Sequence, residues 1–334
     1  LVVLKDGTTT LNGALTINAT STTASYTLPV GGGINGQVLS MLDATTGTTT
    51  WTTVAGGGAI TGLVSVTESG NTGHRLATAP VNNHGDIGDD AIDLSMQDAL
   101  STTRGATGQY AFATGRRTTA SGAYSTAFGR DTEATADYAT AWGRNTDATG
   151  QYATAWGNDT KATGGFYATA WGASTSASGT YSTAFGRDTE ATADYATAWG
   201  FNTEATGEFA TAWGRNTQAT GSYTSAWGLN TNANGILTTA WGSSTTASGS
   251  YSTAFGFNTG AESYAQTTIG TYNTTQTGNA TSFATNDRLL VVGNGTGPST
   301  RSDALVILKN GNTTLNGALT INASSTTASY TLPV

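Results

Sequence analysis

The stretch Arg144-Asn-Thr-Asp-Ala-Thr-Gly-Gln-Tyr-Ala-Thr-Ala-Trp-Gly157 is one copy of the unit that decides the fold of this chain. Such units follow one another 12 times between Thr102 and Gly270, each with 14 residues except a 15-residue copy at 158–172. Position 14 is Gly and position 5 is Ala in every copy, and position 3 is Thr in all but the first. A short unit that recurs without a break indicates a solenoid, in which each repeat stacks on the next.

Two further positions of the unit carry aromatic side chains. Position 13 is Trp in seven copies and Phe in three, and position 9 is Tyr or Phe in most. We assign the aromatic side chains of position 13 to the structural core, namely Trp142, Trp156, Trp171, Trp199, Trp213, Trp227, Trp241, Phe128, Phe185 and Phe255. We assign the glycines of position 14 to turns, among them Gly129, Gly143, Gly157, Gly172, Gly186 and Gly200.

The unit predicts a flattened coil of two short β-strands. In Tyr-Ala-Thr-Ala-Trp the residues alternate, with Tyr, Thr and Trp on one face and two Ala on the other. Asn-Thr-x-Ala-Thr forms the second strand, and the glycine-containing corners allow the chain to turn. Coils stacked about 4.8 Å apart form parallel ladders, and 12 of them give a rod of very roughly 55 Å. We expect the position-13 aromatics to fill a thin interior and the Ala face to pack against other copies, as a trimer.

These residues resemble a known family. The run Tyr-[Ala/Ser]-Thr-Ala-[Trp/Phe]-Gly, followed by x-x-Thr-x-Ala-x-Gly, is similar to the head repeat of trimeric autotransporter adhesins of the YadA type. In that family the strand runs Ser-Val-Ala-Ile-Gly at the same spacing. The resemblance covers residues 102–270 and implies an all-β fold, a homotrimeric left-handed parallel β-roll (β-solenoid). Thr and Trp stand here where the family has Val and Ile, so its core packing is not carried over.

A longer duplication frames the repeats. Residues 1–30 recur at 305–334 with four changes, which pair Val3 with Ile307, Asp6 with Asn310, Thr8 with Asn312 and Thr20 with Ser324. This near-identity suggests one period of a longer tandem array. We expect a β-rich connector at 1–70, an N-terminal cap at 71–101, the head at 102–270, a C-terminal cap at 271–304, and the start of the next connector at 305–334. Exposed sheet edges need such caps.

Composition excludes several classes of function. The net charge of −8 gives no electrostatic basis for binding nucleic acid or an anionic membrane. Without Cys the chain has no disulfides, thiol nucleophile or cysteine-based zinc site. No apolar run has the length of a membrane span, so we expect no membrane contact. The chain opens at Leu1, without Met or a signal peptide, and we expect it to be a fragment.

Candidate chemical sites are few. His84 lies near Asp86, Asp89, Asp90 and Asp93, a spacing at which carboxylates could hold Ca²⁺. The cluster lacks the ligand alternation of a calcium loop, and Asp is common in turns, so we favour a turn and cap. The repeated Arg-Asp-Thr-Glu motif at 130–133 and 187–190 is interpreted as a surface ion pair rather than a binding patch. Stacked Trp could bind sugars, but a regular Trp column is more typical of a core. With two His in the chain, a Ser-His-Asp triad is not expected, and we predict neither an enzyme nor a cofactor.

Three functions remain. We favour an extracellular fibre on the bacterial cell surface, which presents β-roll heads for attachment to an unknown receptor or neighbouring cell. A phage or contractile-injection-system tail fibre is the first alternative, which the genomic neighbourhood would distinguish. The second is an ice-binding solenoid, because Thr recurs at positions 3, 6 and 11. We rank it last, since positions 3 and 11 are expected to point inward and position 6 mixes Thr with Ser and Asn.

Overall fold

The computed structural model describes residues 62–320 without a gap, and before them the segments 2–3, 9–10, 16–18, 25–27, 37–43 and 48–53. Two compact units are distinguished, Leu1–Val64 and Ser65–Val334. Residues 31–36 and 56–58 of the expected connector, and residues 321–334 of its second copy, lie outside the described residues.

The first unit contains two small groups of strands. β1 (Val2–Val3) pairs with β2 (Thr9–Thr10) in an antiparallel manner. The second group is a four-stranded sheet in which β3 and β4 are antiparallel, β4 and β6 parallel, and β5 and β6 antiparallel. Its strands are β3 (Thr16–Asn18), β4 (Ser25–Thr27), β5 (Gln37–Asp43) and β6 (Thr48–Thr53).

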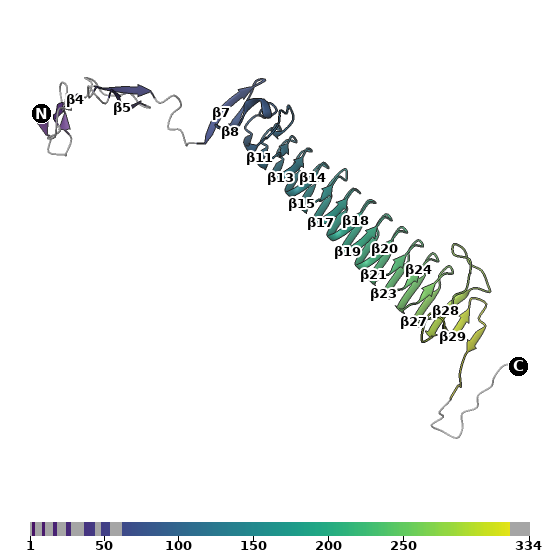
Figure 1. Ribbon diagram of the computed structural model, residues 1–334. Coiled ribbons are helices and arrows are strands. Elements are labelled where there is room, and N and C mark those ends of the chain that lie inside the picture. Colours follow the sequence, from purple (N-terminus) through teal and green to yellow (C-terminus); the bar gives the residue numbers. More distant parts are fainter. Residues whose placement is uncertain are drawn as a thin grey trace. The chain divides into compact units, whose positions relative to one another are not determined.

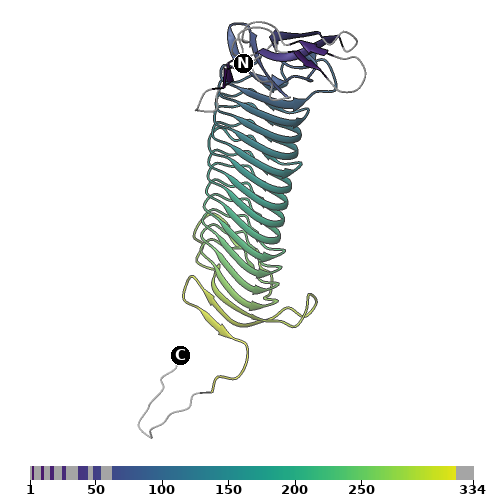
Figure 2. The ribbon, with the colours of Figure 1, turned by 90° about the vertical axis from the view of Figure 1, so that its left-hand side faces the viewer.

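The second unit contains a β-solenoid, whose stacked coils are visible in Figures 1 and 2. Each residue of a coil lies opposite its equivalent in the next coil, so that Trp142 pairs with Trp156 in parallel register. Among the described residues there is no α-helix, and the one helical segment is the 3₁₀ turn η1 (Val81–Asn83). The predicted all-β, parallel solenoid is therefore confirmed.

In several coils one strand runs through the corner, and in the others the corner divides it in two. The solenoid strands are β10 (Gly105–Ala106), β11 (Phe112–Arg116), β12 (Thr119–Ala120), β13 (Thr126–Ala134), β14 (Thr140–Ala148), β15 (Thr154–Asn158), β16 (Lys161–Ala162), β17 (Thr169–Ala177), β18 (Thr183–Ala191), β19 (Thr197–Ala205), β20 (Thr211–Ala219), β21 (Ser225–Leu229), β22 (Asn232–Ala233), β23 (Thr239–Ser243), β24 (Thr246–Ala247), β25 (Thr253–Phe257), β26 (Gly260–Ala261) and β27 (Thr267–Thr271).

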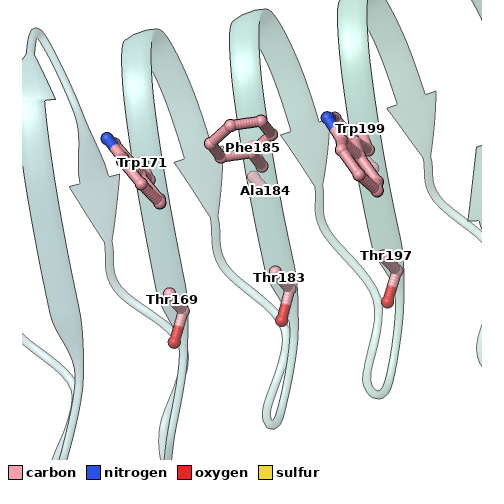
Figure 3. A pocket seen from close by; sticks show the side chains of 8 residues that line it. Thr169, Trp171, Thr183, Ala184, Phe185, Thr197 and Trp199 are labelled. Atoms are coloured by element: carbon pink, nitrogen blue, oxygen red, sulfur yellow. The ribbon is translucent and has the colours of Figure 1, made fainter. Parts of the chain in front are cut away.

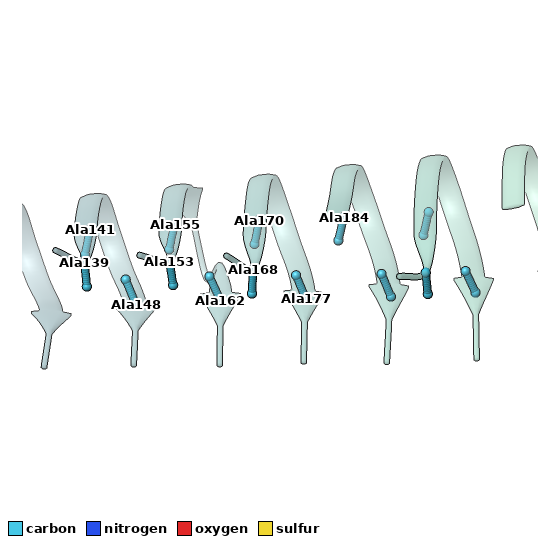
Figure 4. Packing of buried hydrophobic residues seen from close by; sticks show 14 of the residues in the cluster. Ala139, Ala141, Ala148, Ala153, Ala155, Ala162, Ala168, Ala170, Ala177 and Ala184 are labelled. Carbon is cyan, nitrogen blue, oxygen red and sulfur yellow. The ribbon is translucent and has the colours of Figure 1, made fainter. Parts of the chain in front are cut away.

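The interior of the solenoid is built from very small side chains. Figure 4 shows the alanines of positions 5, 10 and 12, such as Ala148, Ala153 and Ala155, stacked in columns inside the coils. These three are fully buried, and so is the position-3 threonine, for example Thr146. The hydrophobic core thus consists of alanine methyl groups, supplemented by a column of threonines.

The predicted core role of the position-13 aromatics is wrong for the single chain. The seven Trp side chains point outward and are 39–49% exposed, and the Ala face that we expected at a partner is the interior. One corner bends within a strand and the other spans five residues, as at 135–139 between β13 and β14, so the two strands of a coil lie closer together than the roughly 10 Å that separates ordinary packed sheets. Only side chains of about the size of a methyl group fit between them, so the bulky face turns outward.

The position-14 glycines lie where the strand bends around one corner. At Gly157 φ is +135°, a conformation that residues with a Cβ rarely adopt. A Cβ on Gly157 would also lie 1.9 Å from the carbonyl oxygen of Gly172 in the next coil. Position 2 follows with φ near +55°, as at Asn145, a value that Asn and Asp tolerate. Glycine at position 14 is therefore required by the stacking itself.

Both ends of the solenoid are covered by other segments. At the N-terminal end, β9 (Ile92–Met96) pairs with β11 and with β8 (Asn71–Leu76), which follows β7 (Leu63–Glu68). At the C-terminal end, β28 (Arg288–Asn294) continues the parallel ladder from β27. The chain then reverses, because β29 (Asp303–Leu308) and β30 (Thr313–Leu315) add antiparallel strands.

Two glycines in neighbouring coils test the stacking constraint. Gly157→Ala should lower the free energy of unfolding by at least about 2 kcal/mol, because the residue must keep a strained φ and its Cβ meets backbone. Gly165→Ala is the matched control, since its Cβ would meet only the Thr180 hydroxyl, at 3.5 Å. Urea unfolding followed by circular dichroism measures both. Equal effects of the two substitutions would contradict this account of position 14.

Candidate functional site

The outer face of the solenoid carries three parallel columns of side chains. In most coils positions 11 and 13 place Thr and Trp or Phe on the outer face of the strand, as in Thr197 and Trp199, and the exposed Tyr of position 9, such as Tyr195, lies in the turn just before that strand. The position-13 column runs from Phe128 to Phe255, roughly 45 Å at the usual strand spacing. We call these three columns the aromatic face.

The Trp rings stack on one another along the solenoid. Where two Trp are neighbours, as Trp142 and Trp156 are, ring centroids lie 4.7–5.4 Å apart and the planes differ by 2–18°. At the boundary between Trp and Phe the rings mostly meet edge to face, with Phe185 tilted by 73° from Trp171. Ring contacts of this kind add stability beyond the burial of area.

The Tyr column of position 9 is a second stack. From Tyr110 to Tyr223 neighbouring ring centroids lie 4.7–5.2 Å apart with nearly parallel planes. In both stacks each ring covers the faces of its neighbours, so mainly ring edges are presented to a ligand. Sugars stack on ring faces, and the stacks therefore do not favour the sugar-binding alternative.

A hollow interrupts the Trp column at Phe185, as Figure 3 shows. It lies between Trp171 and Trp199, where the smaller Phe ring leaves space, and Thr169, Thr183 and Thr197 border it. Its volume is about 320 Å³. The hollow is part of the aromatic face, and its exposed lining is apolar.

Position 11 also lies outside, contrary to our expectation that it points inward. Thr154 and Thr211 are exposed, and Thr140 is half-buried. The reason is the alternation of the strand, which places position 11 on the same face as the outward Trp. Position 3 does point inward, as predicted. One exposed rank of threonine thus runs between two aromatic columns.

A buried ionic cluster organises the N-terminal end. The Arg75 side chain, 2% exposed, donates hydrogen bonds to both Glu68 oxygens at 2.9 and 3.1 Å and to the Gly85 carbonyl at 2.9 Å. The Nδ1 atom of His84 lies 2.8 Å from Oδ2 of Asp93, and the Ser95 amide donates to Oδ1 at 3.0 Å. These bonds tie β7, β8 and β9 to the loop between them.

Hydrogen bonds lower the pKa of the Asp93 carboxyl. Burial alone would raise this pKa, but hydrogen bonds from His84 and Ser95 and the charge of His84 outweigh it. Asp93 is therefore ionised at neutral pH and acts as the acceptor at the centre of the cluster.

The weak metal candidates do not converge. Oδ2 of Asp86 accepts a hydrogen bond from the Ser69 hydroxyl, and Oδ1 of Asp89 lies 3.5 Å from the Thr72 amide. Asp90 occupies a turn with φ of 54°, and its amide donates to the Thr72 carbonyl. Within the part of the chain that the structure describes, no three His, Asp or Glu side chains form a group that could hold a metal ion. The cluster suits the turns of the cap.

The Arg-Asp-Thr-Glu motifs form local ion pairs. Nε of Arg130 lies 3.2 Å from Oδ2 of Asp131, and Nε of Arg187 lies 3.3 Å from Oδ2 of Asp188. Asp131 also accepts from Arg117 of the preceding coil, at 2.7 Å. The interpretation of these motifs as surface ion pairs is confirmed.

The comparison with family models agrees with the geometry of the coils. The YadA head domain repeat, in a model that spans two copies, matches this chain six times, at residues 106–132, 120–146, 164–189, 177–203, 205–231 and 233–259. Residues 106–259 are YadA-like head repeats. No curated protein matches the chain. The predicted family resemblance is thereby confirmed for the repeat region.

The match to the YadA head domain repeat tells which kind of protein module carries the aromatic face. YadA-like heads are β-rolls of trimeric autotransporter-type adhesins, and their family is structural rather than enzymatic. Here the head repeat places Trp and Tyr stacks on the outside of the coil, with Ala inside. In the residues that the structure describes there is no helix with the length and apolarity needed to cross a bilayer.

The sequence analysis did not identify most members of the buried ionic cluster. It placed His84 among four aspartates, but only Asp93 is bonded to it, and Arg75 and Glu68 went unnoticed. The alternation of β9 would have indicated the opposite, since the ordinary rule buries Ile92 and Leu94 and exposes Asp93, whereas Asp93 is buried and Ile92 exposed. The partners come from separate strands, and no local pattern joins them.

Removing the Asp93 carboxylate should loosen the N-terminal cap. Because the folded-state pKa lies below the ordinary 3.8, this carboxylate stabilises the cap above that value and ceases to do so as the pH falls through the folded pKa. Asp93→Asn should destabilise β9 by about 3 kcal/mol at pH 6, since it leaves buried partners unpaired. The loss of stability below pH 4 should then be smaller than in the unmodified chain.

Hydrogen exchange of β9 amides between pH 2.5 and 6, corrected for intrinsic rates, measures this effect. Asp98→Asn is the control, because the exposed Asp98 carboxylate pairs with Arg116 at the surface and should change protection little. If Asp93→Asn left the protection of β9 and its pH dependence unchanged, the buried cluster would not hold the cap.

Proposed function

We propose that this chain forms part of a homotrimeric extracellular fibre on the surface of a bacterium, which presents β-roll heads for attachment. The observation that carries the proposal is the run of YadA-like head repeats across residues 106–259. The unit repeated at 1–30 and 305–334 supports the further proposal that this chain is one period of a tandem array.

The aromatic face supports assembly into trimers. Monomeric proteins rarely expose a continuous apolar patch of this length, and such patches mark interfaces. The chain buries only Ala and Thr inside its coil, whereas its Trp side chains remain nearly half exposed. Three copies that turn their aromatic faces toward a common axis would bury the Trp and Thr columns together. The sequence suggested that the alanines form the interface. The aromatic face, on the other side of the same strands, takes this role instead.

The remaining segments fit a fibre as caps and connectors. We assign residues 71–101 and 271–304 to the caps of the head, and 1–70 and 305–334 to connectors. Ladder hydrogen bonds run along the fibre axis and resist stretching. Weak contacts to a receptor or neighbouring cell, repeated along many heads, add up through avidity.

Other functions receive less support. A tail fibre could use the same roll, and nothing in the described residues favours it over a surface fibre. Ice binding needs two adjacent ranks of threonine on a flat face, and the exposed rank at position 11 lies between Tyr and Trp columns instead. The acidic chain, with its net charge of −8, gives no reason to expect nucleic acid as a partner.

Charges placed in the aromatic face should dissociate the trimer. The double substitution Trp199→Lys and Trp213→Lys puts two ammonium groups per chain where three copies would meet, which should shift the mass from three chains to one at micromolar concentration. The coil itself should remain folded, because neither side chain enters its interior. Analytical ultracentrifugation gives the mass, and circular dichroism the fold.

The control places two ammonium groups on other strand segments of the same coils, with a larger change in net charge because two carboxylates are also removed. Glu190→Lys and Glu204→Lys occupy position 4, outside the aromatic face, and should leave the trimer intact. Dissociation by both pairs, or by neither, would contradict the assignment of the interface.

Attachment is tested with beads coated at equal density with the unmodified chain or either double variant. Retention under flow is scored on cultured animal cells, bacterial cells and mineral surfaces. We expect beads with the unmodified chain to be held on at least one surface. Beads with the double Glu→Lys variant should be held equally well, and those with the double Trp→Lys variant about tenfold less or worse, because avidity is lost. Absence of retention on every surface would count against an adhesive role and leave a structural spacer.

A further inference from the structure

The same pair of strands occurs twice in this chain. In β29 and β30, Val306 lies opposite Thr314 and Ile307 opposite Thr313. In β1 and β2, Val2 lies opposite Thr10 and Val3 opposite Thr9, which is the identical register 304 residues earlier. We call residues 305–315 the C-terminal hairpin and residues 1–11 the N-terminal hairpin.

The C-terminal hairpin has a definite task at the end of the head. Its first strand pairs with β28, the last parallel strand, so that Val306 lies opposite the fully buried Val291. It thereby occupies backbone donors and acceptors that would otherwise form an open edge. β29 pairs with β28 on one side and with β30 on the other, so the hairpin covers this end of the solenoid.

A buried lysine fixes the C-terminal hairpin to the head. The Lys309 side chain is 1% exposed, its Nζ lies 3.9 Å from the Asp287 carboxylate, and it sits 5.6 and 5.5 Å from the ring centroids of Tyr264 and Phe283. An ammonium group is rarely buried unless it is paired. Asp287 and the two rings belong to the head and its cap, so they form a receptor for this particular side chain.

The N-terminal hairpin keeps the residues that this contact needs. Lys5 corresponds to Lys309, and the apolar positions are identical or, at Val3, one methylene smaller. The residues that join the two strands change conservatively: Asn310 accepts a hydrogen bond from the Asn312 amide, and the sequence has Asp and Thr at the equivalent positions 6 and 8. Lys5 therefore has the charge and length needed to bind a site like that formed by Asp287, Tyr264 and Phe283.

We infer that the N-terminal hairpin is the closing cap of another head, and that its partner is a strand of the β28 type, with an Asp287-type receptor, on a second copy of the unit. In its own unit that place is occupied by the C-terminal hairpin. This arrangement rests on the tandem array of the proposed function. It specifies the residue at which one unit ends and the contact by which it joins the next. The boundary between heads lies after the hairpin, not before residue 305.

Cysteine trapping between two full-length chains tests the inference, because the chain contains no Cys. The acceptor chain carries Leu290→Cys, with Val306→Asp and Lys309→Glu to release its own hairpin. The donor chain carries Val3→Cys, the equivalent of Ile307, which lies opposite Leu290. Under mild oxidation we expect a donor–acceptor disulfide, at least about tenfold more abundant than with a Thr8→Cys donor, because the equivalent residue, Asn312, lies outside the strand that pairs with β28.

A second variant covers the case in which the acceptor chain fails to fold. Ile307→Val, Asn310→Asp and Asn312→Thr together convert residues 305–315 into a copy of residues 1–11. Hydrogen exchange of β28 should stay within about twofold of the unmodified chain, whereas Lys309→Met should raise it at least tenfold. Loss of β28 protection in the triple variant, or equal trapping by both donors, would overturn the inference. Neither readout depends on attachment or on the trimer, so failure here is separable from failure of the proposed function.

Discussion

The thinness of the coil is the constraint on which the rest of the structure depends. Fourteen residues provide two short strands and two tight corners, and the space between the strands holds side chains no larger than Ala and Thr. The corner leaves no room for a Cβ at position 14, because the carbonyl of the next coil lies there. Large side chains can only lie outside, where they stack at the coil spacing. These three restrictions explain which residue types recur at each position of the repeat.

A coil with such a core cannot supply much hydrophobic stabilisation alone. An alanine methyl group buries far less apolar area than Leu or Ile, and stabilisation scales with that area. The largest apolar side chains of this chain, the Trp and Tyr stacks, remain partly in contact with water. Stability must therefore come largely from the hydrogen-bonded ladders and the covered ends, and, in the trimer proposed here, from neighbours that bury the outer stacks. A fibre of several chains meets all three requirements, and YadA-like heads are trimeric.

The sequence alone allowed prediction of the repeat, the all-β class, the parallel stacking and the family, because each follows from a period that recurs 12 times. It did not reveal which face of the strand lies inside. Alternation separates Tyr, Thr and Trp from Ala, but assigning the larger group to the core applied a rule for ordinary sheets to a coil too narrow for it. The surroundings of Asp93 were equally inaccessible, since Arg75 reaches it from another strand and pairs in turn with Glu68. Residues 1–30 were recognised as a duplicate of 305–334, but the pairing of β29 with β28 could not be predicted, because these strands carry no repeat period.

The most direct test of this account is a cross-section of the assembled head, determined by electron cryomicroscopy at a resolution that separates strands. The account predicts three solenoids around one axis, with the Trp stacks of all three facing that axis and the alanines enclosed within each coil. A single solenoid with its Trp column facing solvent, or a trimer joined through another face, would contradict it.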